Sequence, residues 1–318
     1  MGHRRYGSGF TLLELMIALA LGLIIVAAGF AVFLSSSRSL GLQSGMSELQ
    51  QNANFGLSLV IHDLRHTNLN TVSAQKVNNI TNGSGIIFSK DNLPAGLQNI
   101  DNLENEYVTL QNKDTDSTKG KSDRLVIQYV PSTDNIVNCE GGTISAASSK
   151  IIVQRYYIAQ SPQQVDGEPI AYSLYCDAGY YVAGSTTIEG LNNHAQQLMQ
   201  RVDTFKIRLG VKNPAGNLRY MTINEYIVAM KNIRDMCSTP IDENICAKNY
   251  LNVVSIEVGL LSRSTGTIGS DAKLNTKSTF DIAGSSVALD GDAAVNKRYL
   301  RQSVNQVVAI RNTLGASQ

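Results

Sequence analysis

The fold is decided by residues 9–34, which read GFTLLELMIALALGLIIVAAGFAVFL. After Glu14, residues 15–34 contain neither a charged residue nor a proline. A helix over these residues, at about 1.5 Å rise each, is about 30 Å long, which matches the hydrocarbon thickness of a bilayer. We therefore predict that residues 10–34 form the transmembrane part of a helix.

A short basic segment precedes the apolar run. Residues 3–5 read HRR, and the positive-inside rule places residues 1–9 in the cytoplasm and exports the rest of the chain. A secretory signal has its small-residue cleavage site after the apolar stretch, whereas here the small residues 7–9 (GSG) come before it. Cleavage after Gly9 would remove a leader of residues 1–9, keep the helix and make Phe10 the new N-terminus.

One acid, Glu14, lies on the first turn of this apolar helix. An acid well inside a bilayer costs on the order of 3 kcal/mol, so its presence needs a physical reason. A position in the headgroup zone is one reason, since an acid there favours the helix N-terminus through the helix dipole. A functional role is the other, and Glu14 considered alone leaves both open.

The string GFTLLE at residues 9–14 resembles the class III signal of type IV prepilins. That pattern is Gly, Phe, three mostly apolar residues, Glu and a long apolar run, and all of it is present. The resemblance implies that prepilin peptidase needs Gly9 at the cut and that the new amine of Phe10 is methylated. It also implies that Glu14 pairs with the Phe10 amine of a neighbouring subunit. A methylated amine keeps its charge, and an ion pair among apolar helices is costly to leave unmade, so Glu14 would set the register of assembly.

The sequence departs from major pilins at one point in this helix. Those proteins usually carry a proline partway along it, where residues 28–32 here read AGFAV. Gly22 and Gly29 either soften the helix, at up to ~1 kcal/mol each relative to Ala, or permit close contact between helices. The sequence leaves both possibilities open.

The composition favours a β-rich head beyond the membrane. Hydrophobic residues make up 43% of the chain, enough for a core, but charged residues only 17%, below the usual quarter or so. Gly, Ser, Thr and Asn replace them, which is typical of strands and loops with neutral polar surfaces. The net charge of +1 and the scattered basic residues give no support for direct nucleic-acid binding.

The rest of the chain predicts an α+β fold, in which a long N-terminal helix, half of it transmembrane, packs on a mainly antiparallel β-sheet head. Apolar residues recur at helical spacing through residues 35–70, so we expect the head-proximal part of the helix there. The exported globular head follows over residues 71–318. Its expected elements are a hairpin of 151–159 with 170–176, strands at 125–130, 205–211, 256–260 and 304–310, weaker strands at 85–88 and 107–110, and a short amphipathic helix over 224–237.

Four cysteines, Cys139, Cys176, Cys237 and Cys246, all lie beyond the membrane segment. An even number in such a place favours an oxidising compartment and disulfides. Of the three possible connectivities we choose sequential pairing, Cys139–Cys176 and Cys237–Cys246, the latter around the turn residue Pro240. Free buried thiols are the alternative.

Two segments are similar to metal sites only in part. Residues 62–66, HDLRH, place two histidines four apart as in a zinc metalloprotease helix, but Asp63 replaces the general-base Glu and no third ligand is evident. Residues 112–123 resemble a calcium loop, yet the glycine falls late and Leu125 occupies the closing position.

No Gly-x-Ser-x-Gly, phosphate-loop or Rossmann glycine pattern occurs. We therefore expect no catalytic residue, no metal and no cofactor.

A second resemblance extends along the chain. Four segments are similar, in order, to PilW-type minor pilins: DLR at 63–65, VDTFKIRLGV at 202–211, VVSIEVGLLSRS at 253–264 and AIRN at 309–312. The usual Arg-x-Ala-Gly after the long helix reads here Arg65-His66-Thr67-Asn68.

These resemblances imply a structural minor pilin rather than an enzyme. Such a protein joins other minor pilins and the major pilin, primes fibre assembly and sits at or near the tip beneath a tip adhesin, supporting twitching motility, adhesion and DNA uptake. Prepilin peptidase, the inner-membrane assembly platform and the inner membrane are the other implied partners. The expected location is a single pass in the inner membrane with a periplasmic head, followed by the pilus fibre.

Two alternatives stay open at this stage. A minor pseudopilin of a type II secretion system carries the same signal. A membrane-anchored exported enzyme or binding module would instead show a polar cleft with converging titratable groups in the head.

Overall fold

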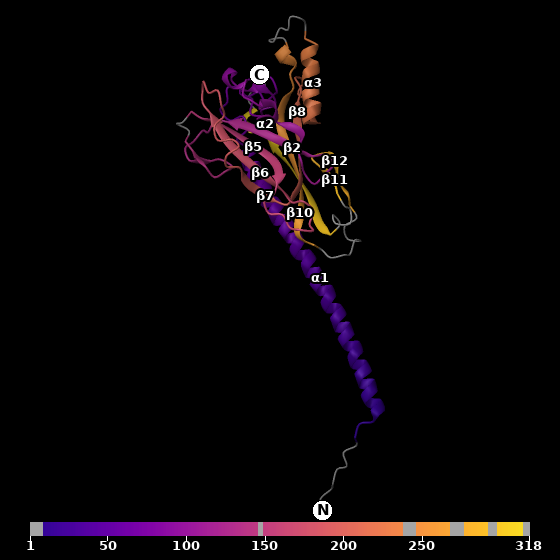
Figure 1. Cartoon of the computed structure of the whole chain (residues 1–318). Coiled ribbons are helices and arrows are strands. Elements are labelled where there is room, and N and C mark those ends of the chain that lie inside the picture. The colour runs from indigo at the N-terminus through magenta and orange to yellow at the C-terminus, as the bar shows by residue number, and fades with distance from the viewer. Residues whose placement is uncertain (1–8, 146–148, 238–245, 268–276, 292–297, 314–318) are drawn as a thin grey trace, which may run out of the picture.

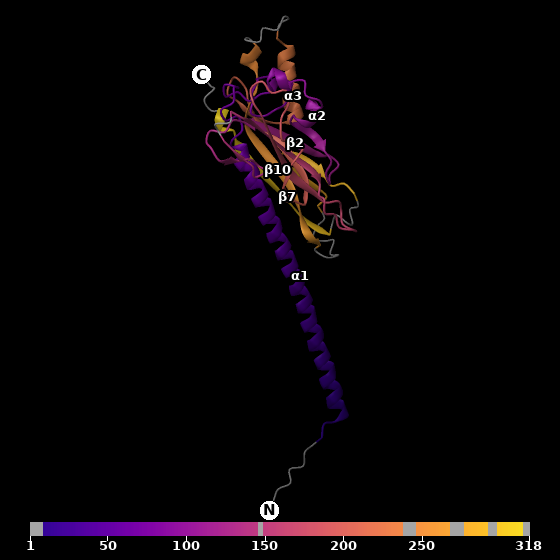
Figure 2. The same cartoon turned by 60° about the vertical axis from the view of Figure 1, so that its left-hand side comes forward.

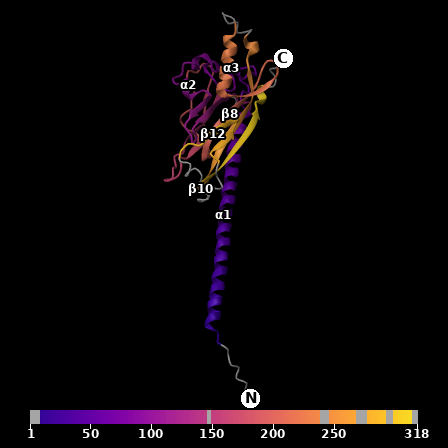
Figure 3. The same ribbon diagram turned by 90° about the vertical axis from the view of Figure 1, so that its right-hand side faces the viewer.

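The computed structural model describes residues 9–145, 149–237, 246–267, 277–291 and 298–313. A single long helix, α1, extends from a head made of two antiparallel sheets, and the three views agree on this arrangement (Figures 1, 2 and 3). The N-terminal end of α1 lies far from the head, whereas its C-terminal end lies against the sheets. The predicted fold class, a long helix on an antiparallel β-sheet head, is confirmed.

Helix α1 spans Leu12–Leu64, 53 residues, and is about 80 Å long at 1.5 Å per residue. It continues without a break through Gly22 and Gly29, where an added Cβ would meet nothing within 4 Å. The helix ends at Leu64 rather than at residue 70, because the following turns hold Asn68 and Asn70 at φ of 66° and 52°. These left-handed conformations cannot continue an α-helix.

The larger sheet has five strands in the order β1-β2-β5-β6-β7, and each neighbouring pair is antiparallel. Its strands are β1 Leu110–Asp114, β2 Ser122–Tyr129, β5 Ile151–Gln160, β6 Tyr172–Tyr181 and β7 Gln196–Gln200.

The second sheet has the order β13-β10-β8-β9, also antiparallel throughout. Its strands are β8 Val202–Lys212, β9 Leu218–Thr222, β10 Asn252–Thr267 and β13 Tyr299–Ala309. Two small hairpins pair β3 Ile136–Val137 with β4 Thr143–Ile144, and β11 Thr279–Ile282 with β12 Ser285–Ala288. The further helices are α2 Leu103–Glu106, α3 Ile223–Asp235 and 3-10 turns at Lys90–Asn92, Ala95–Leu97, Ala247–Asn249 and Arg311–Thr313.

The core joins one face of α1 to both sheets. In the head-proximal half of α1 the buried residues recur every three or four positions and face β7, β10 and β13: Leu49, Ala53, Gly56, Leu57, Val60, Asp63 and Leu64. The apolar residues Ala53, Leu57, Val60 and Leu64 share a single hydrophobic cluster with Tyr156 of β5, Phe205 of β8 and Tyr226 of α3. A second cluster, which includes Ile87, Leu93 and Val126, packs the 85–108 region against the larger sheet. Strand β2 is therefore buried on both faces.

The stronger secondary-structure predictions are confirmed. The hairpin of 151–159 and 170–176 corresponds to β5 and β6, residues 205–211 lie in β8, 256–260 lie in β10, and the short helix is α3. The weaker predictions are wrong. Residues 85–88 form no strand, only an isolated bridge between Ile86 and Ile127, and β1 begins at Leu110, so that 107–109 precede it.

Candidate functional site

The N-terminal end of α1 holds Glu14 in a capping box with Thr11. The Thr11 amide donates to Glu14 Oε2 at 2.9 Å, the Thr11 hydroxyl donates to the same oxygen at 3.0 Å, and the Glu14 amide donates to Thr11 Oγ1 at 3.2 Å. The capping box thereby satisfies the amides of Thr11 and Glu14, two of the donors that a helix start leaves unpaired. The Glu14 carboxylate consequently points back toward Thr11 at the start of the helix, and Gly9 and Phe10, which precede it, lie outside the helix and are exposed.

The first half of α1 is apolar on every side and exposed throughout residues 12–34. Among the described residues, α1 is the one helix long and apolar enough to cross a membrane. A helix that is hydrophobic all round needs lipid or other helices around it. This half of α1 is exposed along its whole length, so lipid or neighbouring helices could pack against it.

At the other end of α1, Asp63 turns into the head. Its Oδ2 accepts a hydrogen bond from the Tyr156 hydroxyl of β5 at 2.8 Å. Burial raises the pKa of Asp63 above its ordinary value, and the bond from Tyr156 acts in the opposite direction. Burial likewise raises the pKa of Tyr156 well above its ordinary value, so Tyr156 remains a hydrogen-bond donor at physiological pH.

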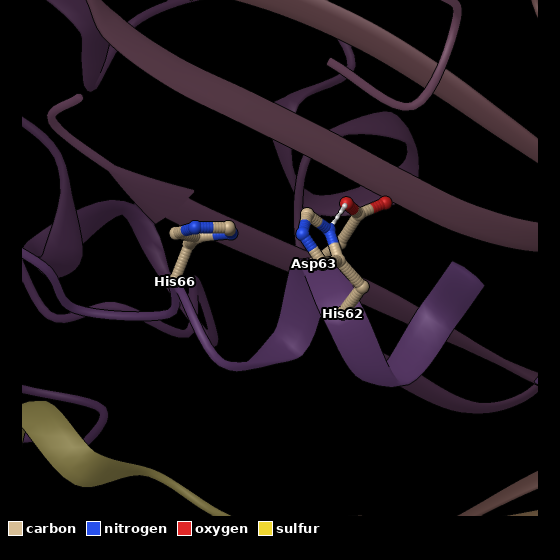
Figure 4. Close-up of side chains that lie close together, drawn as sticks. All are labelled: His62, Asp63 and His66. Carbon is tan, nitrogen blue, oxygen red and sulfur yellow. Dashed lines mark hydrogen bonds and ion pairs between the residues drawn. The ribbon is translucent and has the colours of Figure 1, made fainter. Parts of the chain in front are cut away.

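Two histidines flank Asp63 at this end of the helix (Figure 4). His62 Nδ1 lies 3.3 Å from Asp63 Oδ1, and the rings of His62 and His66 meet edge to face at 5.1 Å. The His66 ring also stacks on Tyr129 at 5.5 Å, and burial lowers the pKa of His66. The structure therefore places ligand atoms of His62, Asp63 and His66 within 4.8 Å of one another, although the sequence pattern favoured no metal here.

The segment that follows α1 is hydrogen-bonded to the C-terminal segment through Asn68 and Asn312. Asn68 Nδ2 donates to the Asn312 carbonyl at 3.2 Å, and Asn312 Nδ2 donates to the Thr67 carbonyl at 2.9 Å. Asn68 Oδ1 accepts from the Gly85 amide at 2.7 Å. The segments 63–65 and 309–312, quoted above as PilW-like, are thus two sides of one junction. Asn68 has a φ of 66°, a left-handed conformation that Asn tolerates better than most residues.

The cysteines are joined in sequential order. The Cys139–Cys176 bond, with Cα atoms 6.1 Å apart, ties the segment around β3 and β4 to β6 of the larger sheet. The Cys237–Cys246 bond, with Cα atoms 5.9 Å apart, links the end of α3 to the segment before β10. Pro240 lies outside the described residues. Both separations fall in the usual range for disulfides.

The acids of the calcium-like segment 112–123 do not converge. Each carboxylate is bound by donors of the protein itself: Asp114 by Arg124, Asp116 by the hydroxyls of Thr118 and Ser122, and Asp123 by the amides of Asn112 and Ile207 and by Lys206. These acids serve the packing of β1 and β2 against β8.

Sequence reasoning predicted none of the contacts that Thr11, Tyr156 and Asn312 make. Thr11 could have been found, since Thr-x-x-Glu before an apolar run is the signature of a capping box. The other two act across 93 and 244 residues of chain and leave no local pattern.

Two family models match the sequence. Residues 4–30 match the prokaryotic N-terminal methylation motif, and residues 155–312 match type IV pilus-assembly protein W. No curated protein matches the chain. Among solved structures, a type IV-like pilin from Thermus thermophilus aligns over 84% of this chain and 98% of its own, with 11% identity and a TM-score of 0.38. An overlap this loose adds nothing to the family matches.

Proposed function

Because this chain is a pilin-like protein of the PilW type, we propose that it is a minor pilin that co-assembles with other minor pilins to prime type IV pilus formation. The carrying observation is the N-terminal end of α1. There Thr11 and Glu14 cap the exposed, apolar first half of the helix, a few residues beyond the bond that a prepilin peptidase would cut.

The proposed maturation uses three residues. Prepilin peptidase cleaves after Gly9, the new amine of Phe10 is methylated, and this amine pairs with the Glu14 carboxylate of an adjacent subunit. In the free chain the Glu14 carboxylate accepts from Thr11 only through one of its oxygens, Oε2. Within the described residues the other oxygen, Oε1, has no hydrogen-bond partner and could accept from an incoming ammonium group.

Packing of the apolar half of α1 is the proposed driving interaction. Residues 12–34 would leave lipid and enter a bundle of similar helices through a heterologous, open-ended contact. The head would follow as a fixed unit, since the head-proximal half of α1 is tied to it by Asn52 donating to the Gln200 carbonyl at 3.0 Å and Thr265 donating to Glu48 at 2.7 Å.

In this proposal the protein has a structural role in the fibre and no catalytic role of its own. Before assembly it is a single-pass inner-membrane protein with a periplasmic head. It then joins other minor pilins and the major pilin at or near the fibre tip, beneath a tip adhesin, with the help of the inner-membrane assembly platform. Twitching motility, adhesion and DNA uptake would follow from the fibre.

Deletion of the gene and complementation test the proposal. We expect the deletion to lose surface pili and twitching motility, and the wild-type gene to restore both. Normal piliation together with lost protein secretion would contradict it and indicate a minor pseudopilin of a type II secretion system instead.

A further inference from the structure

The end of α1 carries a cluster of ligating groups that the assembly role does not use. The nitrogen atoms of His62 and His66 and the carboxylate oxygens of Asp63 offer ligand atoms that all lie within 4.8 Å of one another. Figure 4 shows the three side chains rising from the same end of the helix, with the His62 ring against the Asp63 carboxylate. We propose that His62, Asp63 and His66 form a binding site for a divalent cation of the Zn²⁺ class, with three protein ligands and one open position.

The distances suit this cation. Zn²⁺ binds imidazole nitrogen and carboxylate oxygen at about 2.0–2.2 Å in a tetrahedral arrangement, in which neighbouring ligand atoms lie about 3.3–3.5 Å apart. His62 Nδ1 and Asp63 Oδ1 are already 3.3 Å apart. A shift of the His66 ring by about 1 Å would complete one face of the tetrahedron, and this needs only a small torsional change within the same rotamer well.

Tyr156 prepares the carboxylate for this role. Its hydroxyl occupies Asp63 Oδ2 at 2.8 Å and leaves Oδ1 facing His62. Ligating carboxylates are commonly oriented in this way by an outer hydrogen bond, and the loss of such a partner typically lowers metal affinity 10–100-fold. On the other side, the stack with Tyr129 fixes the plane of the His66 ring.

The charge and the access also fit a cation. Asp63 is 8% exposed, and within the described part of the chain it has no lysine or arginine as an ion partner. A buried carboxylate without a cation is unfavourable, so a bound metal ion would compensate for the lost hydration. The His62 side chain is 66% exposed, which gives a metal ion and its water ligand a path to the site.

The site would fasten the last turn of α1 to the residues beyond the helix, at the point where the chain enters the head. His62 and Asp63 belong to the last turn of α1, whereas His66 follows its end at Leu64. The fourth position would hold water or a ligand from a neighbouring molecule.

The test is a Co²⁺ titration of the untagged full-length chain in detergent micelles, followed by competition with Zn²⁺. All four cysteines are in disulfides, so thiolates do not compete for the metal. We expect the visible absorption of a four-coordinate Co²⁺ site at one equivalent, its displacement by Zn²⁺, and a rise in Tm with Zn²⁺. The matched variants are His62→Ala, His66→Ala and Tyr156→Phe, with His194→Ala, an exposed histidine in another part of the head, as control.

The proposal requires that His62→Ala and His66→Ala each weaken binding about 100-fold or more, that Tyr156→Phe weaken it about 10–100-fold, and that His194→Ala leave it unchanged. His62 is exposed, so this variant keeps its fold, which the cooperative thermal transition without metal verifies. Binding of Zn²⁺ only at millimolar concentration, or equal binding by folded His62→Ala and the wild type, would overturn it.

Discussion

The Tyr156 hydroxyl donates to the Asp63 carboxylate at 2.8 Å and thereby ties the last turn of the long helix to the middle of the five-stranded sheet. The two residues are 93 positions apart in sequence. Tyr156 is fully buried and Asp63 is 8% exposed, so water cannot replace this bond. The helix that carries the membrane anchor and the head that it presents are therefore connected by a polar contact as well as by the apolar core.

Removal of this hydroxyl should destabilise the head. We expect Tyr156→Phe to lower the free energy of unfolding by about 1.5–3 kcal/mol, the range for a hydrogen bond to a charged group, because Asp63 stays buried without its donor. Tyr220→Phe is the control, since Tyr220 is exposed. Urea unfolding of the full-length chain in detergent, followed by the near-ultraviolet circular dichroism of tyrosine, measures both. Equal stability of the two variants would contradict the importance of the contact.

The docking of α1 on β7 depends on Gly56. A Cβ at this position would lie 2.9 Å from Met199 Cβ, which is too close for ordinary packing. We expect Gly56→Ala to cost about 1–3 kcal/mol of stability, as overpacking does, despite the better helix propensity of Ala.

Gly41→Ala is the matched control for Gly56, because this glycine lies in the same helix with nothing within 4 Å of its added Cβ. It should be neutral or stabilising by up to about 1 kcal/mol, the propensity difference between Gly and Ala. A Gly56→Ala variant as stable as Gly41→Ala would mean that the helix does not pack on β7 as described.

The hydrogen bonds and the left-handed backbone of Asn68 predict that different substitutions at this position lower the stability by different amounts. Asn68→Gly keeps the left-handed backbone but loses the hydrogen bonds with Gly85 and Asn312, whereas Asn68→Ala loses both the bonds and the favourable conformation. We expect Asn68→Ala to be about 1–2 kcal/mol less stable than Asn68→Gly.

Asn135→Ala separates the hydrogen-bond contribution of Asn68 from the contribution of its left-handed backbone conformation. Asn135 has a φ of 64° but is exposed, so its replacement reports the conformational cost alone. Thermal unfolding should rank Asn68→Ala below Asn135→Ala. The reverse order would show that the hydrogen bonds of Asn68 contribute little.

The two disulfides should contribute unequally. In the chain-entropy account, a bond that closes a longer loop stabilises more, which gives about 4 kcal/mol for Cys139–Cys176 and about 3 kcal/mol for Cys237–Cys246. Their sequence separations are 37 and 9 residues. We expect the paired replacement Cys139→Ala and Cys176→Ala to lower Tm more than Cys237→Ala with Cys246→Ala, and a larger effect of the second pair would contradict this account.

The parts of this protein that could be predicted from sequence are those with a local or periodic signal. The apolar helix, the hairpin of β5 and β6, and the alternation in β8 and β10 are of this kind. The apolar residues 85–88 mislead, because they are buried against β2 through a single bridge and not through a strand ladder. The conformation of this segment is determined by tertiary packing rather than by its β-propensity.

The polar junction at the end of α1 could not be predicted for a different reason. Its contacts join residues 62–68 to Tyr129, Tyr156 and Asn312, which belong to separate strands or to the chain end. A side-chain hydrogen bond across such separations leaves no pattern in a single sequence. The three candidate ligands His62, Asp63 and His66 are neighbours in sequence, but the contact that buries Asp63 against Tyr156 forms only when the helix docks on the head.

The role of Glu14 is the central claim, and the capping box refines how it must be tested. Glu14→Ala removes both the charge and the cap on Thr11, so its effect alone is ambiguous. Glu14→Gln keeps a side chain that can complete the capping box but removes the charge, whereas Thr11→Ala removes the hydroxyl of the cap and keeps the charge.

Incorporation into sheared surface fibres, measured by immunoblot in a deletion strain that expresses each variant at equal membrane levels, is the most direct measurement. If Glu14 pairs with the Phe10 amine of a neighbour, Glu14→Ala and Glu14→Gln should both lose incorporation, while Thr11→Ala should retain it. The account would be contradicted if Glu14→Gln were incorporated normally, or if Thr11→Ala were the one variant that lost incorporation. Glu14 would then be a helix cap in the headgroup zone.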